Sequence, residues 1–290
     1  MRLYIWWNRI ANAVICGLYR APQGVRLKKI RIPVSDGAKI VCFVIEPEQK
    51  NEKLPVMRFC HGGAFFMPVF KTILMLGARY AQSLNCRVFI PQYRLSLDYP
   101  YPVPLTDCHD TLDYIGSHAD ELCADMEKLL VYGDSAGGCL AAETVHMCRD
   151  SGKWMPKGQL LIYPVTDRSS DYASMEKYRY AVWSAQANQN MWNIYLRNRK
   201  NGEKDYAVPM ENERFDGLPP AYVEVAEMDC LCDQGLAYAE KMRQAGVPVK
   251  TALIPGAYHG YEGNLQSPLV RRVLEGRIEI MKEMLRSGRL

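Results

Sequence analysis

The sequence lacks a strong charge of either sign. Its 36 basic and 32 acidic residues nearly cancel, leaving a formal net charge of +4 over 290 residues, and both signs are spread along the chain. Binding to nucleic acid usually needs a concentrated basic surface. A nucleic-acid partner is therefore not expected.

Long uninterrupted apolar runs are also missing. The apolar segment at residues 1–20 is broken by Asn8, Arg9 and Asn12. Its apolar core is short and no small-residue cleavage site follows it, which favours an amphipathic helix over a signal peptide or a membrane span. We therefore expect no integral membrane association.

Metal-binding spacings are scarce, although the chain has ten cysteines. Cys230 and Cys232 form a C-x-C pair without a second cysteine pair or a nearby histidine, which is poor spacing for zinc. In a chain without a secretion signal, cysteines are more typically buried reduced thiols than a disulfide framework. The sequence thus predicts no metal, no cofactor and a cytoplasmic protein.

No repeat, low-complexity tract or flexible linker divides the chain, so we expect a single domain over residues 1–290. Short apolar runs of strand length alternate with helical periodicity. The runs lie at residues 56–60, 87–92, 129–133, 159–163, 222–226 and 249–254, and helical periodicity is clearest at 106–118 and 136–148. This alternation predicts an α/β fold with a mostly parallel sheet between helices, and an edge hairpin at 26–33 and 39–46.

Between residues 163 and 222 the alternation stops for nearly sixty residues that are rich in tyrosine and tryptophan. A structureless loop of this length is improbable in a compact domain, so the segment should be helical. We expect an insertion at about 168–215 and the segment at about 1–24 to form a helical cap near the ligand-binding edge of the sheet. The alternative is that these aromatic side chains only pack within a helical layer, and for most of them we favour this alternative over a role at the site.

The strongest chemical signal is the motif GDSAGG at residues 133–138, which follows an apolar run and precedes a helical pattern. A strand, G-x-S-x-G and a helix place a serine at a sharp, exposed turn, so Ser135 is the candidate nucleophile. Gly133 and Gly137 suit this turn because side chains there would collide with neighbouring backbone. Asp134 should point away from the serine hydroxyl and act as structural support. The alternative is an ordinary glycine-rich turn.

A second motif, HGGA at residues 61–64, directly follows a predicted strand. A loop of small residues can bring backbone N–H groups within hydrogen-bond distance of a tetrahedral oxyanion. The alternative is a Gly-Gly turn, formed by Gly62 and Gly63, beside a core histidine, His61.

Five motifs together resemble the hormone-sensitive-lipase-like family of α/β hydrolases in order and spacing. They are HGGA at 61–64, YRL at 93–95, GDSAGG at 133–138, DCL at 229–231 and HG at 259–260. The resemblance implies the α/β-hydrolase fold and the backbone N–H groups of Gly63, Ala64 and Ala136 as oxyanion donors. Ala64 stands where the family more often has glycine. Alanine keeps the N–H donor, but its Cβ restricts the backbone and narrows the space beside the acyl group.

The candidate general base is His259, on a loop after the last predicted strand, where the fold's chain order of serine, acid and histidine expects it. The chain has four other histidines. His61 belongs to the HGGA loop, and His109, His118 and His146 lie in predicted helices, where packing or solvated roles are expected.

The candidate acid is Asp229, which follows the predicted strand at 222–226 and matches the family's D-x-L motif. Glu227 lies in or near the strand, and Asp233 already enters the next helix. A carboxylate beside the histidine would fix its tautomer and stabilise the imidazolium that forms when the serine is deprotonated. The alternative for Asp229 is a helix N-cap residue.

A serine, an aspartate and a histidine in this chain order predict acyl transfer through an acyl-enzyme intermediate. The family resemblance implies a serine carboxylesterase that acts on small-molecule esters with short to medium acyl chains. Two alternatives stay open: an amidase, peptidase or formamidase on the same fold, and an inactive hydrolase homologue that binds a ligand. The oligomeric state is also open, with a homodimer as one alternative.

Overall fold

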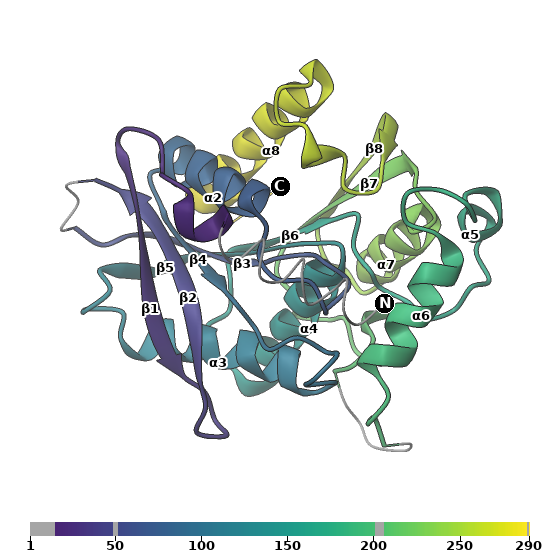
Figure 1. Ribbon diagram of the computed structural model, residues 1–290, viewed down its shortest axis with the longest axis horizontal. Helices are drawn as coiled ribbons and strands as arrows, with labels where there is room; N and C mark the ends of the chain where they lie inside the picture. Colours follow the sequence, from purple (N-terminus) through teal and green to yellow (C-terminus); the bar gives the residue numbers. More distant parts are fainter. Residues whose placement is uncertain (1–14, 49–51, 201–205, 289) are drawn as a thin grey trace.

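An eight-stranded sheet forms the centre of the protein, seen here in a computed structural model that describes residues 15–48, 52–200, 206–288 and 290 (Figure 1). The strands are β1 (Val25–Pro33), β2 (Lys39–Pro47), β3 (Leu54–Cys60), β4 (Arg87–Pro91), β5 (Ala124–Asp134), β6 (Gly158–Ile162), β7 (Ala221–Met228) and β8 (Val249–Tyr258). Their order is β1-β2-β4-β3-β5-β6-β7-β8. β2 pairs antiparallel with β1 and β4, and the remaining pairs are parallel. The predicted edge hairpin and mostly parallel sheet are both confirmed.

The central strands are buried on both faces, which explains their nearly continuous apolar sequence. Every residue of β4 and β6 is buried. Strands that helices cover on both sides cannot alternate polar and apolar residues, because neither face meets water. β5 begins earlier than the predicted residue 129, because its first residues pair with the start of β3 across a register irregularity. Apolar character alone does not reveal this half-exposed extension.

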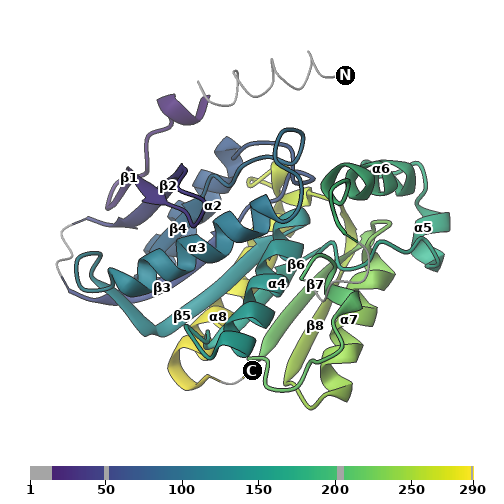
Figure 2. The same ribbon diagram turned by 90° about the horizontal axis from the view of Figure 1, so that it is seen from below.

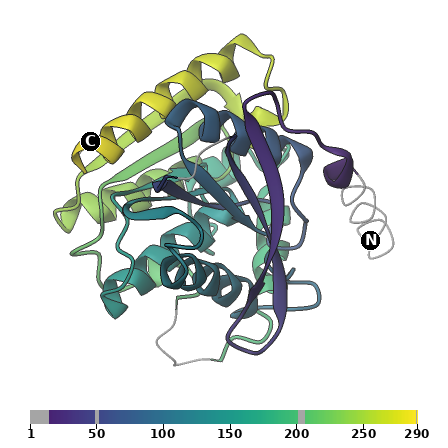
Figure 3. The ribbon, with the colours of Figure 1, turned by 90° about the vertical axis from the view of Figure 1, so that its left-hand side faces the viewer.

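Helices cover both faces of the sheet (Figures 1 and 3). α2 (Lys71–Leu84) and α8 (Pro268–Ser287) pack on one face, and α3 (Val103–Ser117), α4 (Ala136–Ser151) and α7 (Cys232–Gln244) pack on the other. A large apolar cluster lies under each layer. None of the helices in the described part of the chain is both long and apolar enough to cross a bilayer.

The segment between β6 and β7 contains α5 (Ala173–Lys177), α6 (Ala185–Tyr195) and the short helix η1 (Pro209–Glu211). Figure 2 shows α5 and α6 together beyond one end of the sheet. Trp192 and Tyr195 are buried, whereas Tyr180 is 90% exposed. The segment is partly helical, as expected, and these two buried aromatics pack in the core. Of the expected N-terminal cap, residues 1–14 lie outside the described residues, and residues 15–18 are helical.

Candidate active site

Ser135 lies at the corner between β5 and α4, where the backbone turns sharply. Its φ of 54° and ψ of −122° are rare for a residue with a side chain. The turn is held by a 2.9 Å hydrogen bond that the Ser135 N–H donates to the carbonyl of Ile162. A Cβ on Gly133 would lie 2.1 Å from the Gly137 carbonyl oxygen, and a Cβ on Gly137 would lie 2.1 Å from the Cys60 carbonyl oxygen. The expected collisions at these glycines are therefore present, and they explain the G-x-S-x-G spacing.

Three side chains that are distant in the sequence meet at this corner. The Oγ of Ser135 lies 2.9 Å from Nε2 of His259, which directly follows β8. Nδ1 of His259 lies 2.7 Å from Oδ2 of Asp229, which directly follows β7. Parallel strands end at the same edge of a sheet, so the ends of β5, β7 and β8 bring the three groups together. A hydroxyl, an imidazole and a buried carboxylate therefore lie in series within hydrogen-bond distance.

The surroundings of His259 favour the protonated, positively charged form of its imidazole. Burial alone would lower the pKa of this imidazole, but the adjacent Asp229 carboxylate raises it, and the pKa lies above its usual value. Asp229 is wholly buried and also accepts a 3.1 Å hydrogen bond from the Leu231 N–H, so its orientation is fixed. The alternative for Asp229, a helix N-cap residue, is wrong, because the N-cap of α7 is Leu231 and no side chain caps this helix. Each oxygen of the Asp229 carboxylate has its own partner, the Leu231 N–H and the imidazole.

The HGGA loop runs beside Ser135, with its backbone in unusual conformations. Ala64 has a φ of 54°, in the left-handed region that favours glycine, and Gly63 has a φ of 114°. Within the described residues the N–H groups of Gly63 and Ala64 have no hydrogen-bond acceptor in the protein. The N–H of Ala136 belongs to the first residue of α4, where helical N–H groups have no partner within the helix. These three groups are thus available for a ligand oxygen.

Asp134 supports the HGGA loop: its Oδ1 accepts a 3.1 Å hydrogen bond from the Gly62 N–H. Burial raises the pKa of Asp134 to about 7, and the negative charge of Glu262 acts in the same direction. Asp134 also lines the cavity at Ser135, which its expected role as structural support did not include.

His61 is a buried part of this loop. Its ring stacks on the ring of Tyr93 with centroids 4.3 Å apart, and the Tyr93 hydroxyl donates a 2.9 Å hydrogen bond to the His61 carbonyl oxygen. Burial lowers the pKa of His61 to about 4, which keeps the imidazole neutral near pH 7. These contacts hold the loop that leads to Gly63.

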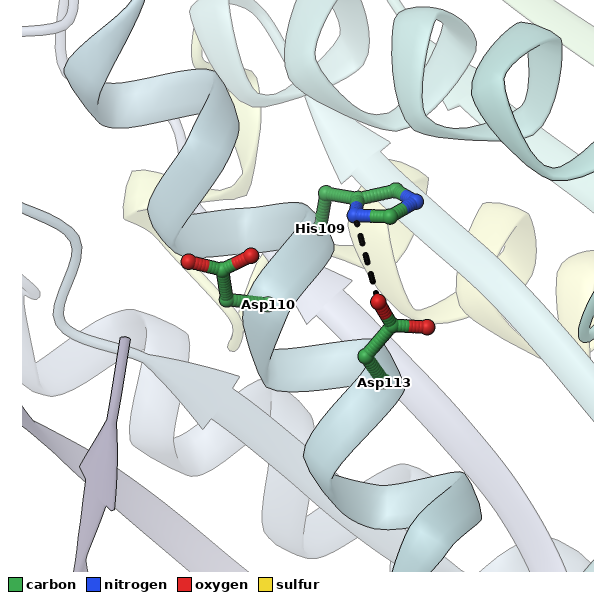
Figure 4. Close-up of side chains that lie close together, drawn as sticks. All are labelled: His109, Asp110 and Asp113. Carbon is green, nitrogen blue, oxygen red and sulfur yellow. Dashed lines mark ion pairs between the residues drawn. The ribbon is translucent and has the colours of Figure 1, made fainter. Parts of the chain in front are cut away.

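The other three histidines lie away from Ser135. His146, in α4, is buried with Nε2 3.1 Å from the Tyr238 hydroxyl, and His118 caps the end of α3. His109 lies near Asp110 and Asp113 on α3, and Figure 4 shows its Nδ1 facing the Asp113 carboxylate at 3.7 Å. Their ligand atoms are close enough to share an ion, but all come from one helix surface and half-exposed acidic groups are common without a metal. The prediction of no metal stays a prediction.

A cavity of about 300 Å³ opens at Ser135. Part of its lining is apolar and is called the apolar wall: Phe66, Met67 and Phe70 lie between the HGGA loop and α2, and Ile73 and Leu76 lie on α2. Ser135, His259, Asp134, Tyr163 and Glu262 also line the cavity. Such a cavity can hold an apolar group against α2 while a polar, reactive group lies at the serine.

Sequence reasoning missed three residues around His259. The indole of Trp183, from the segment before α6, stacks on the imidazole with centroids 5.7 Å apart, and Tyr163 packs against it at 4.9 Å. Glu262, in the short helix η2 (Tyr261–Gly263), is near enough for its negative charge to raise the pKa of His259. The sequence does show that Glu262 lies only three positions after His259. Neither this spacing nor the composition predicts that its carboxylate is buried.

Comparison with known proteins gives the same fold. The model of a protein family with the description "alpha/beta hydrolase fold" matches residues 57–263. Arylesterase from Saccharolobus solfataricus is 30% identical over 224 residues, covering 76% of this chain and 72% of the arylesterase. Lipase 2 from Moraxella sp. (strain TA144) is 28% identical over 242 residues, covering 74% of this chain and 56% of the lipase.

Similarity to solved structures extends over nearly the whole chain. A structure described as Bacterial Heroin Esterase is 29% identical with a TM-score of 0.89, covering 96% of this chain and 90% of that chain. Coverage is lower for some relatives, since the chain spans 66% and 56% of the length of two curated proteins that it matches. The chain belongs to the α/β-hydrolase fold family, in its hormone-sensitive-lipase-like branch.

Proposed function

We propose that this protein is a carboxylesterase that cleaves small-molecule esters through Ser135, His259 and Asp229. The observation that carries the proposal is the continuous hydrogen-bonded series from the serine Oγ through the imidazole to a buried carboxylate, at 2.9 and 2.7 Å. Relatives described as arylesterase and heroin esterase support ester bonds over amide bonds.

In the proposed reaction Ser135 attacks the ester carbonyl while His259 takes the hydroxyl proton. Asp229 keeps the Nδ1–H tautomer, so that Nε2 can accept this proton, and stabilises the imidazolium. His259 then donates the proton to the leaving alcohol, and water cleaves the acyl-enzyme by the same steps. The N–H groups of Gly63, Ala64 and Ala136 would stabilise the oxyanion, helped by the positive end of the α4 dipole.

The cavity supports short to medium acyl chains. Its volume of about 300 Å³ is at the lower end of the range for small-molecule sites. We also propose that the chain is one catalytic domain over residues 1–290, whose cap consists of about 1–24 and the insertion at about 168–215. The stacking of Trp183 on His259 supports a covering role for the insertion.

The test is a series of p-nitrophenyl acetate, butyrate, octanoate and palmitate, run with matched p-nitroanilides. We expect hydrolysis of acetate and butyrate, much slower hydrolysis of palmitate, and negligible cleavage of the anilides. Faster cleavage of anilides than of esters would identify an amidase instead. Ser135→Ala should reduce kcat by on the order of a million-fold, whereas Ser151→Ala, at the other end of α4, should keep kcat within about twofold.

A further inference from the structure

A buried polar cluster lies next to the loop that carries His259. We call it the Arg277 cluster, and it consists of Arg277, Glu224, Glu262, Tyr261 and Tyr132. The guanidinium of Arg277, on α8, is wholly buried. It donates hydrogen bonds to Glu224 Oε2 at 2.9 Å, to Tyr261 Oη at 2.7 Å and to Tyr132 Oη at 3.0 Å, and it also pairs with Glu262. The cluster therefore connects α8, β7, β5 and η2.

The cluster holds more negative than positive charge. Arg277 faces two carboxylates, Glu224 and Glu262, and both are buried. A buried charge persists only where partners compensate it. Phenol groups supply the additional donors: Tyr222 donates to Glu224 at 2.9 Å, and Tyr163 donates to Glu262. This donor set permits a second carboxylate beside a single guanidinium.

Glu262 links this cluster to the base. It lies three residues after His259, in η2, whose turn is closed by a 3.0 Å hydrogen bond from the Gly263 N–H to the Gly260 carbonyl. One carboxylate oxygen pairs with Arg277 and the other accepts from Tyr163, whose ring packs against the imidazole. Glu262 thus ties the loop that carries His259 to α8 through Arg277, and to Tyr163, which directly follows β6.

We propose that Glu262 is a positioning residue for His259: held by Arg277 and Tyr163, it fixes the loop that carries the imidazole and places a second negative charge near it. The inference rests on the proposed esterase function, because it assigns Glu262 a part in the same proton transfer. Glu262 acts through His259 and need not contact the reacting atoms.

The charges around His259 determine the sign of the expected effect. The groups that face the imidazole are Asp229 after β7, Asp134 at the end of β5 and Glu262 in η2, with the neutral Tyr163 and Trp183 packed on the ring. Burial lowers the pKa of His259, whereas Asp229, Asp134 and Glu262 all raise it. Removal of the Glu262 charge should therefore lower this pKa and destabilise the imidazolium that forms during the reaction.

The test is Glu262→Gln, which keeps the side-chain shape but removes the charge. Its amide oxygen can still accept from Arg277, whereas its NH2 group would face the Tyr163 hydroxyl as a donor in place of the accepting oxygen. We expect kcat for p-nitrophenyl butyrate to fall about tenfold with little change in KM, and the acid limb of kcat/KM to move down by about 0.5 pH unit. The matched control is Glu283→Gln, which removes the same charge from an exposed position on α8 and should change neither quantity. Wild-type kcat and an unmoved acid limb in folded Glu262→Gln would overturn the proposal.

A second measurement separates this inference from the proposed function. The His259 imidazole can be titrated by NMR without any substrate, with its resonance assigned by comparison with His259→Gln. A lower pKa in Glu262→Gln supports the inference even if no ester is hydrolysed, and an unchanged pKa overturns it. If Glu262→Gln does not fold, Glu262→Asp decides, because it keeps the charge but is one methylene too short to reach both partners. We then expect a lower kcat with an unmoved acid limb, and wild-type kcat would overturn the proposal.

Discussion

Asp229→Asn tests how the buried carboxylate controls the base. The substitution keeps the size of the side chain, and its amide oxygen can still accept from the Leu231 N–H, as Oδ1 of Asp229 does at 3.1 Å. The amide nitrogen then faces Nδ1 of His259 in place of the oxygen that lies 2.7 Å away. An N–H donor at this position favours the tautomer with the proton on Nε2, which cannot accept the proton of Ser135.

The expected loss of kcat is large because His259 would hold the wrong tautomer and its imidazolium would lose the negative charge of Asp229. The corresponding change in serine proteases costs about 10⁴ in kcat, which is about 5.4 kcal/mol of transition-state stabilisation at 1.36 kcal/mol for each factor of ten. KM should change little, because Asp229 is wholly buried. Steady-state kinetics with p-nitrophenyl butyrate measure both constants.

The matched control for this prediction is Asp233→Asn, two positions after Leu231 in the first turn of α7. Its carboxylate accepts a 2.7 Å hydrogen bond from the Ser174 N–H and is not paired with the imidazole. It should keep kcat within about threefold. A kcat within tenfold of wild type for Asp229→Asn would refute the assignment of Asp229.

Three further predictions concern pH, packing and substrate size. The value of kcat/KM should fall as the pH drops through the pKa of His259, because the imidazole then becomes protonated and cannot accept the proton of Ser135. Burial lowers this pKa, but Asp229 raises it above the usual value of about 6.5. An acid limb below pH 6 would therefore contradict the assignment of His259. Gly137→Ala places a Cβ 2.1 Å from the Cys60 carbonyl oxygen and should cost about 3 kcal/mol or more in urea unfolding, whereas Gly276→Ala, with no atom within 4 Å, should be neutral or stabilising by up to about 1 kcal/mol. Leu76→Ala should widen the apolar wall of the cavity and raise the ratio of octanoate to butyrate hydrolysis roughly tenfold, and an unchanged ratio would place the acyl chain elsewhere.

Sequence patterns predicted the sheet well because each signal there is local. The buried strands β4 and β6 read as short apolar runs, and the turn between β1 and β2 contains the glycine that a hairpin favours. The early start of β5 was missed because its first residues are held by pairing with β3 and not by their own apolar character. Long-range pairing leaves no local signal.

The candidate site was predictable to the extent that its residues lie in motifs. Ser135, Asp229 and His259 each follow a strand, and the parallel sheet places the ends of these strands at one edge. The Arg277 cluster could not be predicted in the same way. Arg277 occupies the buried face of α8 together with Leu274 and Met281, and the sequence shows only a charged residue at an apolar position. The hydrogen-bond partners of Arg277 come from α2, β5, β7 and η2, and only the folded structure brings them together.

Labelling with a fluorophosphonate probe tests the central claim most directly, because the probe reacts only with a serine that a neighbouring base activates. Digestion and mass spectrometry should place one phosphonyl group on Ser135, and Ser135→Ala should remove it. Labelling should be much slower in His259→Gln, since the Oγ would lose the base that lies 2.9 Å away. A folded wild-type protein that stays unlabelled, or that is labelled at another serine, would contradict the account.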